Sequence, residues 1–432
     1  MIPPTSLADS SARTRWFAAA NFGLFIHFDQ ASQLGLDLSW PMVGLTSDDG
    51  SGASAHAAVD YLRHVDDFDP RRWDPAALAR AAREAGMTYG VFTTKHHSGW
   101  ASWPSTATPL TIARSPYGRR GGDLVREFVD AFRGEGLRVG LYYSLSDWSD
   151  PDYPAWRPDF APYPFEGYPR PSADEWARYR EGLKAEISEL LTNYGRIDLL
   201  WFDGGWERTQ EEWGSADLEA HIRSLQPEIV LNDRLPGVGD YLTPEQTSPG
   251  ASGGGVWETC VTMNDTWGWS PHDENYKSTG HLLRTLVDSV AHGGNLLLNV
   301  GPDRDGALPA KEIRILRELS EWMQRHGESV VGATSGLAPW QFYGPSTRNG
   351  DSLFLHLLAW PDEEVIVRGI HPRSVVLVEL MTEGRELPFR AVIDPAEART
   401  DHPVGNLVIS VPSTRPDTPL PVIRIRSHGS RA

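Results

Sequence analysis

The sequence predicts a (β/α)8-like barrel of the TIM type followed by a C-terminal antiparallel β-sandwich. Seven short apolar runs alternate with amphipathic helical segments between residues 22 and 326, a pattern typical of a parallel sheet covered by helices. From Gly336 onward, strand-like runs are separated only by turn residues. We therefore assign residues 1–335 to the barrel and 336–432 to the sandwich. An open doubly wound sheet is the alternative, but no G-x-G-x-x-G or P-loop motif supports it.

The barrel strands are expected where apolar runs end in polar side chains, at residues 22–28, 89–94, 138–144, 199–202, 228–234, 256–262 and 295–302. The helices expected around them lie at residues 16–21, 75–85, 121–137, 173–194, 216–225, 278–292 and 309–326. Asp74 and Pro75 begin the second of these helices, and Gly86 ends it. Long irregular loops are expected at 31–66 and 149–171, where they would shape the barrel mouth.

Charge and composition restrict the possible functions. The net charge of −18 argues against a nucleic-acid partner, and no apolar run is long enough to span a membrane. The N-terminus lacks the basic start and apolar segment of a secretory signal, and Cys260 is the only cysteine, so we expect a cytoplasmic protein. The 17 Trp residues favour a carbohydrate ligand, because indole rings cover the C–H faces of sugars. The oligomeric state stays open, a homo-oligomer included.

Asp203 is the first candidate for chemistry. It follows the apolar residues 199–202 and precedes Gly204 and Gly205, so it stands at the C-terminal end of a predicted strand. Barrels of this class place their active sites at that end. A carboxylate after four apolar residues costs desolvation energy unless it is paired or used. The alternative is that Asp203 caps the following turn.

Other strand ends supply side chains that would meet Asp203 at one mouth: His27, His96, His97, Tyr143, Trp201, Arg234 and a glutamate, Glu245 or Glu258. Singly, His27 could be a satisfied core histidine, and Tyr143 and Trp201 could be core aromatics. We expect no cofactor and no metal, because the adjacent side chains of His96 and His97 diverge and lack further ligands at useful spacing. Two carboxylates among neutral donors and aromatics are typical of a glycosidase.

Six segments together resemble the α-L-fucosidases of glycoside hydrolase family 29: FGLFIHF, GVFTTKHHSGW, GLYYSLSDW, ELLTNYGRIDLLWFDG, GDYLTPEQ and LLLNVGPDRDGALP. The similarity runs in the same order from residue 22 to residue 306, and the barrel followed by a sandwich is also similar to the family's architecture. The TKHH and WFDG motifs are specific in combination.

The resemblance implies a retaining mechanism with Asp203, in the WFDG motif, as the nucleophile. Glu245, in YLTPEQ, best matches the acid/base, and Glu258, in VWETC, is the competing residue. The residues implied to bind fucose are His27, His96, His97, Tyr143, Trp201 and Arg234, with Trp269 near the methyl group of the sugar. Tyr142 replaces Tyr143 if the strand phase differs by one residue. The implied substrate is a fucosylated oligosaccharide or glycoconjugate.

The sequence departs from the family pattern on the sugar-recognition side. Phe28 and Asp29 follow the first histidine where the family has Trp-Gly, and residues 98–100 read SGW where Asp-Gly-Phe is common. The family's Glu-Trp-Tyr segment is not visible, and Trp40 is only a weak match. Two alternatives follow. One is a glycosidase of the same mechanism acting on another deoxy sugar or a natural-product glycoside, and the other is a non-catalytic carbohydrate-binding protein.

Overall fold

A computed structural model describes residues 12–43, 58–153, 170–247 and 255–428. At its centre is a parallel sheet of seven strands in the order β5-β4-β3-β2-β1-β7-β6. These strands are β1 (Phe22–Ile26), β2 (Tyr89–Lys95), β3 (Arg138–Ser144), β4 (Leu199–Asp203), β5 (Val230–Leu231), β6 (Glu258–Thr262) and β7 (Asn295–Val300). Each falls within or beside a predicted strand, and the predicted fold class is confirmed.

The sheet closes through residues 241–245, a segment that lies outside the strands predicted from the sequence. Tyr241 forms a parallel bridge with Asn232, just beyond β5, and Glu245 forms one with Cys260 in β6. The segment therefore occupies the eighth strand position of the barrel. This position carries Glu245 to the same end as the other strand ends.

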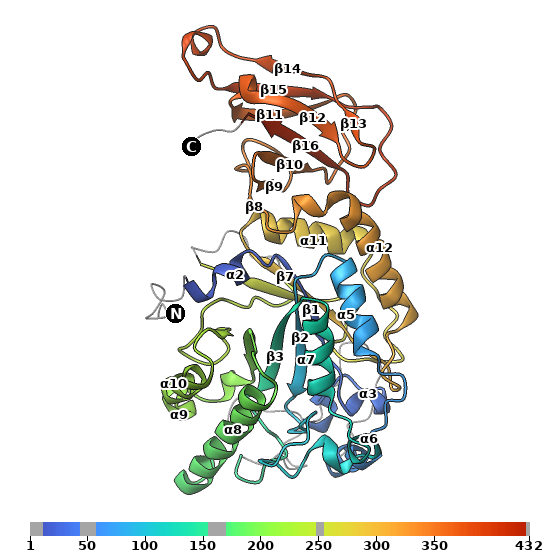
Figure 1. Ribbon diagram of the computed structural model, residues 1–432, viewed down its shortest axis with the longest axis vertical. Coiled ribbons are helices and arrows are strands. Elements are labelled where there is room, and N and C mark those ends of the chain that lie inside the picture. Colours follow the sequence, from blue (N-terminus) through green and yellow to red (C-terminus); the bar gives the residue numbers. More distant parts are fainter. Residues whose placement is uncertain (1–11, 44–57, 154–169, 248–254, 429–432) are drawn as a thin grey trace.

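Helices surround the strands (Figure 1). The longer ones are α5 (Pro75–Glu84), α7 (Leu124–Gly134), α8 (Ala173–Asn193), α10 (Ser215–Leu225), α11 (Thr279–Ala291) and α12 (Ala310–His326), and the shorter ones are α2 (Arg15–Ala18), α3 (Ala31–Leu34), α4 (Ala58–Arg63), α6 (Pro116–Arg119) and α9 (Gln210–Trp213). The expected start of α5 is confirmed, because the Asp74 carboxylate accepts a hydrogen bond from the Ala77 amide. At the start of α8, Ser172 and Glu175 form a capping box.

The predicted loop at 31–66 is not irregular throughout, since α3 and α4 lie within it. Residues 44–57 and 154–169, which belong to the two predicted loops, lie outside the described residues. Within the described ranges, no helix combines the length and the apolar character needed to cross a membrane.

Aromatic side chains fill the barrel at the end where its strands begin. Phe17 of α2 packs against Tyr89 and Tyr241, with ring centroids 5.7 and 4.3 Å away. These residues belong to a buried cluster that continues to Trp201 and Tyr142 further along the barrel axis. The interior is therefore closed on that side, and the C-terminal ends of the strands are left for a cavity.

The C-terminal part is a β-sandwich, as predicted. One sheet has the order β13-β12-β16-β10-β9-β8 and the other β11-β15-β14. The strands are β8 (Thr334–Ser335), β9 (Ser346–Asn349), β10 (Ser352–His356), β11 (Glu364–Ile370), β12 (Val375–Leu380), β13 (Arg385–Glu386), β14 (Phe389–Val392), β15 (Gly405–Ser410) and β16 (Val422–Ser427). Figure 1 shows the sandwich beyond α11 and α12. Asn21, just before β1, bonds to Gly332 and Ala333, so the sandwich lies at the end opposite the strand C-termini.

Candidate active site

A cavity opens at the C-terminal ends of the barrel strands. It is lined by Phe25, His27, Leu38, Trp40, His96, Tyr142, Trp201, Asp203, Trp206, Arg234, Glu245, Cys260 and Trp267. The sequence predicted His27, His96, Trp201, Asp203, Arg234 and Glu245 for this mouth, and the structure brings these six together. His97 lies directly behind them, with its Nε2 atom 3.8 Å from a carboxylate oxygen of Asp203.

Asp203 ends β4 and is buried, with both carboxylate oxygens engaged. Oδ1 accepts a hydrogen bond from Arg234 Nη1 at 2.9 Å, and Oδ2 accepts one from the Tyr142 hydroxyl at 3.0 Å. Burial by itself raises the pKa of Asp203, but Arg234, His97 and the Tyr142 hydroxyl outweigh it and hold that pKa below its ordinary value. Asp203 is therefore an ionised carboxylate that points into the cavity. These contacts hold it there, and not a hydrogen bond that caps the following turn.

Gly204 allows the chain to turn sharply after Asp203. Its φ of 72° lies in the left-handed region, and a Cβ atom there would come within 2.3 Å of the Ser146 hydroxyl. The turn then brings Trp206 over the cavity, where its ring contacts His97 edge to face with centroids 5.6 Å apart. A side chain at position 204 would displace Ser146, which bonds to His97 Nδ1 at 2.8 Å.

Arg234 connects the two carboxylates of the cavity. While Nη1 bonds to Asp203, Nη2 donates to Glu245 Oε2 at 2.7 Å, and the guanidinium lies 4.5 Å from the ring centre of Trp201. The Glu245 side chain is 40% exposed, so it stands at the rim. Arg234 was predicted to bind the sugar, and its contacts also fix the relative positions of Asp203 and Glu245.

The three site histidines are neutral near pH 7. Burial lowers the pKa of His27 to about 4, although Asn299 and Asp203 oppose the shift. Burial likewise lowers the pKa of His97 to about 4, with Asp203 opposing it. For His96, burial and the two neighbouring imidazoles lower the pKa well below its ordinary value. Neutral imidazoles can each donate one hydrogen bond and accept one.

Glu258 lies away from the cavity, in the closed interior of the barrel. Tyr89 and Trp201 donate hydrogen bonds to its carboxylate, the second at 3.0 Å from Nε1, and Tyr241 donates a longer one at 3.4 Å. Burial raises the pKa of Glu258 to about 7. Although such a pKa suits a general acid, Glu258 is fully buried at the start of β6, beneath the Trp201 ring. A general acid must reach the atom that it protonates, so geometry outweighs the pKa here.

Two aromatic residues predicted for the site lie elsewhere. Tyr143 points outward and donates to Glu186 of α8 at 2.7 Å, whereas Tyr142, the alternative phase, faces Asp203. Trp269 packs near Arg304, 5.5 Å from its ring centre, and Trp267 lines the cavity instead. In each case the site residue belongs to the expected segment, but the predicted phase was wrong.

Several cavity residues had no specific sequence signal. Leu38 and Cys260 form apolar parts of the cavity wall. Trp206 lies at the rim and is 47% exposed. Trp40 also lines the cavity, although it only weakly matched the family segment. The predicted loop at 31–66 and the pair Gly204 and Gly205 indicated only that these segments lie near the cavity. Neither feature indicates which side chain points inward.

The chain was compared with known proteins. A family model described as Alpha-L-fucosidase matches residues 3–328. The chain belongs to the α-L-fucosidase family. It is 28% identical to mouse tissue α-L-fucosidase over an alignment of 447 positions, which covers 97% of this chain and 92% of that protein.

Solved structures of α-L-fucosidases superpose on nearly the whole chain. Isoenzyme 1 from Paenibacillus thiaminolyticus matches with a TM-score of 0.82 and 32% identity, covering 97% of this chain and all of the other. A GH29 α-L-fucosidase from Bacteroides thetaiotaomicron, trapped as a covalent intermediate with 2-fluoro-fucosyl fluoride, matches with a TM-score of 0.79 and 25% identity. This match covers 97% of this chain and 96% of the other. Membership of this family makes the chain a glycoside hydrolase.

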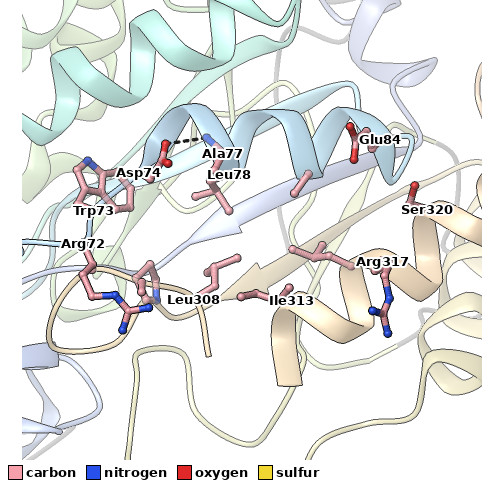
Figure 2. Close-up of a pocket in the computed structure, with 15 residues that line it drawn as sticks. Arg72, Trp73, Asp74, Ala77, Leu78, Glu84, Leu308, Ile313, Arg317 and Ser320 are labelled. Atoms are coloured by element: carbon pink, nitrogen blue, oxygen red, sulfur yellow. Dashed lines mark hydrogen bonds between the residues drawn. The ribbon is translucent and has the colours of Figure 1, made fainter. Parts of the chain in front are cut away.

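A second, larger hollow lies between α5 and the start of α12 (Figure 2). Leu78, Leu308 and Ile313 form its apolar part, and Asp74 at its edge is engaged in capping α5. It offers no pair of carboxylates held close together, so we do not assign the α-L-fucosidase site to it. Among the described residues, no group of three or more His, Cys, Asp or Glu side chains is arranged to hold a metal ion.

Proposed function

We propose that this chain is a retaining exo-α-L-fucosidase that removes terminal α-L-fucosyl groups from oligosaccharides or glycoconjugates. The observation that carries the proposal is the contact of one guanidinium, Arg234, with both Asp203 and Glu245 at the mouth of a single cavity. A retaining glycosidase needs two such carboxyl groups close together, one as nucleophile and one as acid/base. The trapped covalent intermediate of the Bacteroides thetaiotaomicron enzyme supports the same reaction course.

In this proposal Asp203 attacks the anomeric carbon and Glu245 protonates the departing oxygen, so the glycosidic bond breaks as the ester bond to Asp203 forms. Water then attacks the same carbon, Glu245 accepts its proton, and fucose leaves with its anomeric configuration retained. Asp203 is ionised, as a nucleophile must be, and Glu245 lies at the rim, where a leaving group departs. The aromatic filling beneath Trp201 favours a single terminal sugar.

The nucleophile is tested with an aryl α-L-fucoside, comparing wild type with Asp203→Ala. We expect the variant to lose about 10³-fold or more in turnover with an unchanged circular dichroism spectrum. Proton NMR of the first product formed by wild type should show the α anomer of fucose. Wild-type activity in the variant, or a β product, would contradict the mechanism.

The acid/base is tested by comparing Glu245→Gln with Glu258→Gln. Loss of the acid slows substrates with poor leaving groups far more than activated aryl fucosides. We expect that dependence on the leaving group for Glu245→Gln, and a uniform effect or loss of stability for Glu258→Gln. The reverse result would make Glu258 the acid/base. Wild type that binds fucose without hydrolysing any aryl glycoside in a panel would favour a binding protein.

A further inference from the structure

Two of the cavity histidines are held from behind by buried side chains of other elements. His27 Nδ1 lies 2.6 Å from Asn299 Oδ1, at the end of β7, and His96 Nδ1 lies 2.7 Å from Ser39 Oγ. Asn299 and Ser39 are fully buried, while both imidazoles line the cavity. Neither Nε2 atom has a hydrogen-bond partner within the described ranges, so each is available to a sugar hydroxyl.

Asn299 determines which nitrogen of His27 carries the proton. Its amide nitrogen donates to the Trp267 carbonyl at 2.7 Å, and a carbonyl can only accept. The amide oxygen therefore faces His27, and because that oxygen also only accepts, the proton must sit on His27 Nδ1. His27 is neutral, so its Nε2 atom presents a lone pair to the cavity. His27 is an acceptor there.

Ser39 makes His96 a hydrogen-bond donor toward the cavity, whereas His27 is an acceptor. The Ser39 oxygen already accepts a hydrogen bond from the Ser98 amide at 2.8 Å, and we infer that its own buried proton is donated to His96 Nδ1 at 2.7 Å. A neutral His96 that accepts at Nδ1 carries its proton on Nε2. His96 is then a donor toward the cavity. The His27 and His96 ring centres are 6.4 Å apart, close enough for the two rings to bind neighbouring hydroxyl groups of one sugar.

We propose that Asn299 and Ser39 are positioning residues that determine specificity, by fixing His27 as an acceptor and His96 as a donor at Nε2. The cavity then selects a sugar with one hydroxyl that donates to His27 and another that accepts from His96. This inference rests on the proposed function, because it concerns the same site. It adds which hydroxyl must donate a hydrogen bond and which must accept one. It assigns that requirement to two residues outside the cavity wall.

The tautomers can be observed without turnover. The whole enzyme is labelled with 15N-histidine, and protonated and unprotonated ring nitrogens are distinguished by their NMR shifts at pH 7. We expect His27 to carry its proton on Nδ1 and His96 on Nε2. In Ser39→Ala the His96 signals should move toward a mixture of tautomers, and Ser39→Thr, which keeps the hydroxyl, should restore them. The same tautomer for both rings, or a charged ring, would overturn the proposal.

Ser98→Ala is the matched control. It removes a buried hydroxyl from the same network, but it keeps the Ser98 amide that bonds to Ser39. Its own Oγ has no hydrogen-bond partner among the described residues. We expect the His96 signals of this variant to match wild type. A shift as large as that in Ser39→Ala would mean that general loosening of the site, and not the Ser39 hydroxyl, sets the tautomer.

Kinetics with modified aryl α-L-fucosides test the consequence for specificity. Hydrogen or fluorine replaces the 3- or the 4-hydroxyl, since fluorine accepts weakly and cannot donate. In wild type, at the hydroxyl position that binds His96, we expect the fluoro substrate to have a kcat/KM about tenfold higher than the deoxy substrate. At the position that binds His27, we expect the two substrates to have the same kcat/KM. Ser39→Ala should lose the difference at the His96 position, and Ser98→Ala should keep it.

An unchanged fluorine-to-hydrogen ratio in Ser39→Ala would overturn the proposal. If wild type fails to hydrolyse the unmodified fucoside, the proposed function is wrong. The NMR measurement then still decides the tautomers, because it needs no turnover.

Discussion

The ionisation of Asp203 depends on three neighbouring side chains, and Tyr142 is the one that can be removed most cleanly. Arg234 also holds Glu245, and His97 also packs against Trp206. The Tyr142 hydroxyl donates to Asp203 Oδ2 and shares a contact with the Ser144 hydroxyl at 2.9 Å. Its loss therefore alters the carboxylate with little change in the cavity wall.

Tyr142→Phe should shift the acidic limb of the kcat/KM profile to higher pH. The hydrogen bond from Tyr142 stabilises the ionised form of Asp203 and so lowers the pKa of that carboxyl. Without it the pKa rises, and because the proposed nucleophile must be ionised, activity is lost at a higher pH as the solution is acidified. We expect a shift of about half to one pH unit, measured with an aryl fucoside. Tyr143→Phe, whose hydroxyl bonds to Glu186 outside the barrel, should leave that limb in place.

The sequence predicted which segments supply the site, but it did not fix every residue within them. β3 is buried on both faces, so no apolar–polar alternation indicates whether Tyr142 or Tyr143 faces inward. An irregularity in β2, where Thr93 pairs with Tyr142 but Lys95 pairs with Tyr143, adds to the ambiguity. The role of Ser39 could not be predicted either, since 57 residues separate it from His96.

At the level of elements, capping residues and apolar periodicity placed most helices to within a few residues. The eighth strand position was missed because residues 241–245 form only isolated bridges and contain a proline, which cannot donate to a sheet ladder. A buried ion cluster that joins β2 to α8 was missed as well. Lys95 Nζ lies 2.9 Å from Asp147 and 2.8 Å from Glu186, and all three side chains are buried.

Lys95→Met should destabilise the fold by about 3–5 kcal/mol, because it leaves Asp147 and Glu186 as buried carboxylates without their cation. The loop after β3 should loosen too, since Asp147 also accepts bonds from the Ser149 and Asp150 amides. Denaturant unfolding followed by tryptophan fluorescence measures the change. Lys184→Met is the control, because the one ion pair of that lysine among the described residues is a longer, partly exposed pair with Glu181 on α8, and the substitution should cost less than about 1 kcal/mol. Equal effects of the two substitutions would contradict the argument.

For the whole molecule, the sandwich supports the barrel from the end opposite the cavity. Trp322 of α12 donates to the Leu420 carbonyl at 2.8 Å, and Thr347 of β9 donates to the Ser329 carbonyl at 2.6 Å. Phe354 and Leu420 of the C-terminal part belong to the same buried cluster as the barrel helices. All residues that line the cavity precede residue 268. The sandwich should therefore affect stability and leave the chemistry unchanged.

Removing residues 336–432 tests this division of roles. The shortened chain keeps every cavity residue, but it exposes the apolar faces of α11 and α12 and leaves the Trp322 indole without its acceptor. We expect it to aggregate or to melt well below the full chain. Trp322→Phe in the full chain removes this hydrogen bond and part of a buried ring while the sandwich stays in place, so it should lower the melting temperature while kcat/KM on an aryl fucoside stays at the wild-type value. A monodisperse shortened chain with wild-type kcat/KM and melting temperature would show instead that the barrel is stable without the sandwich.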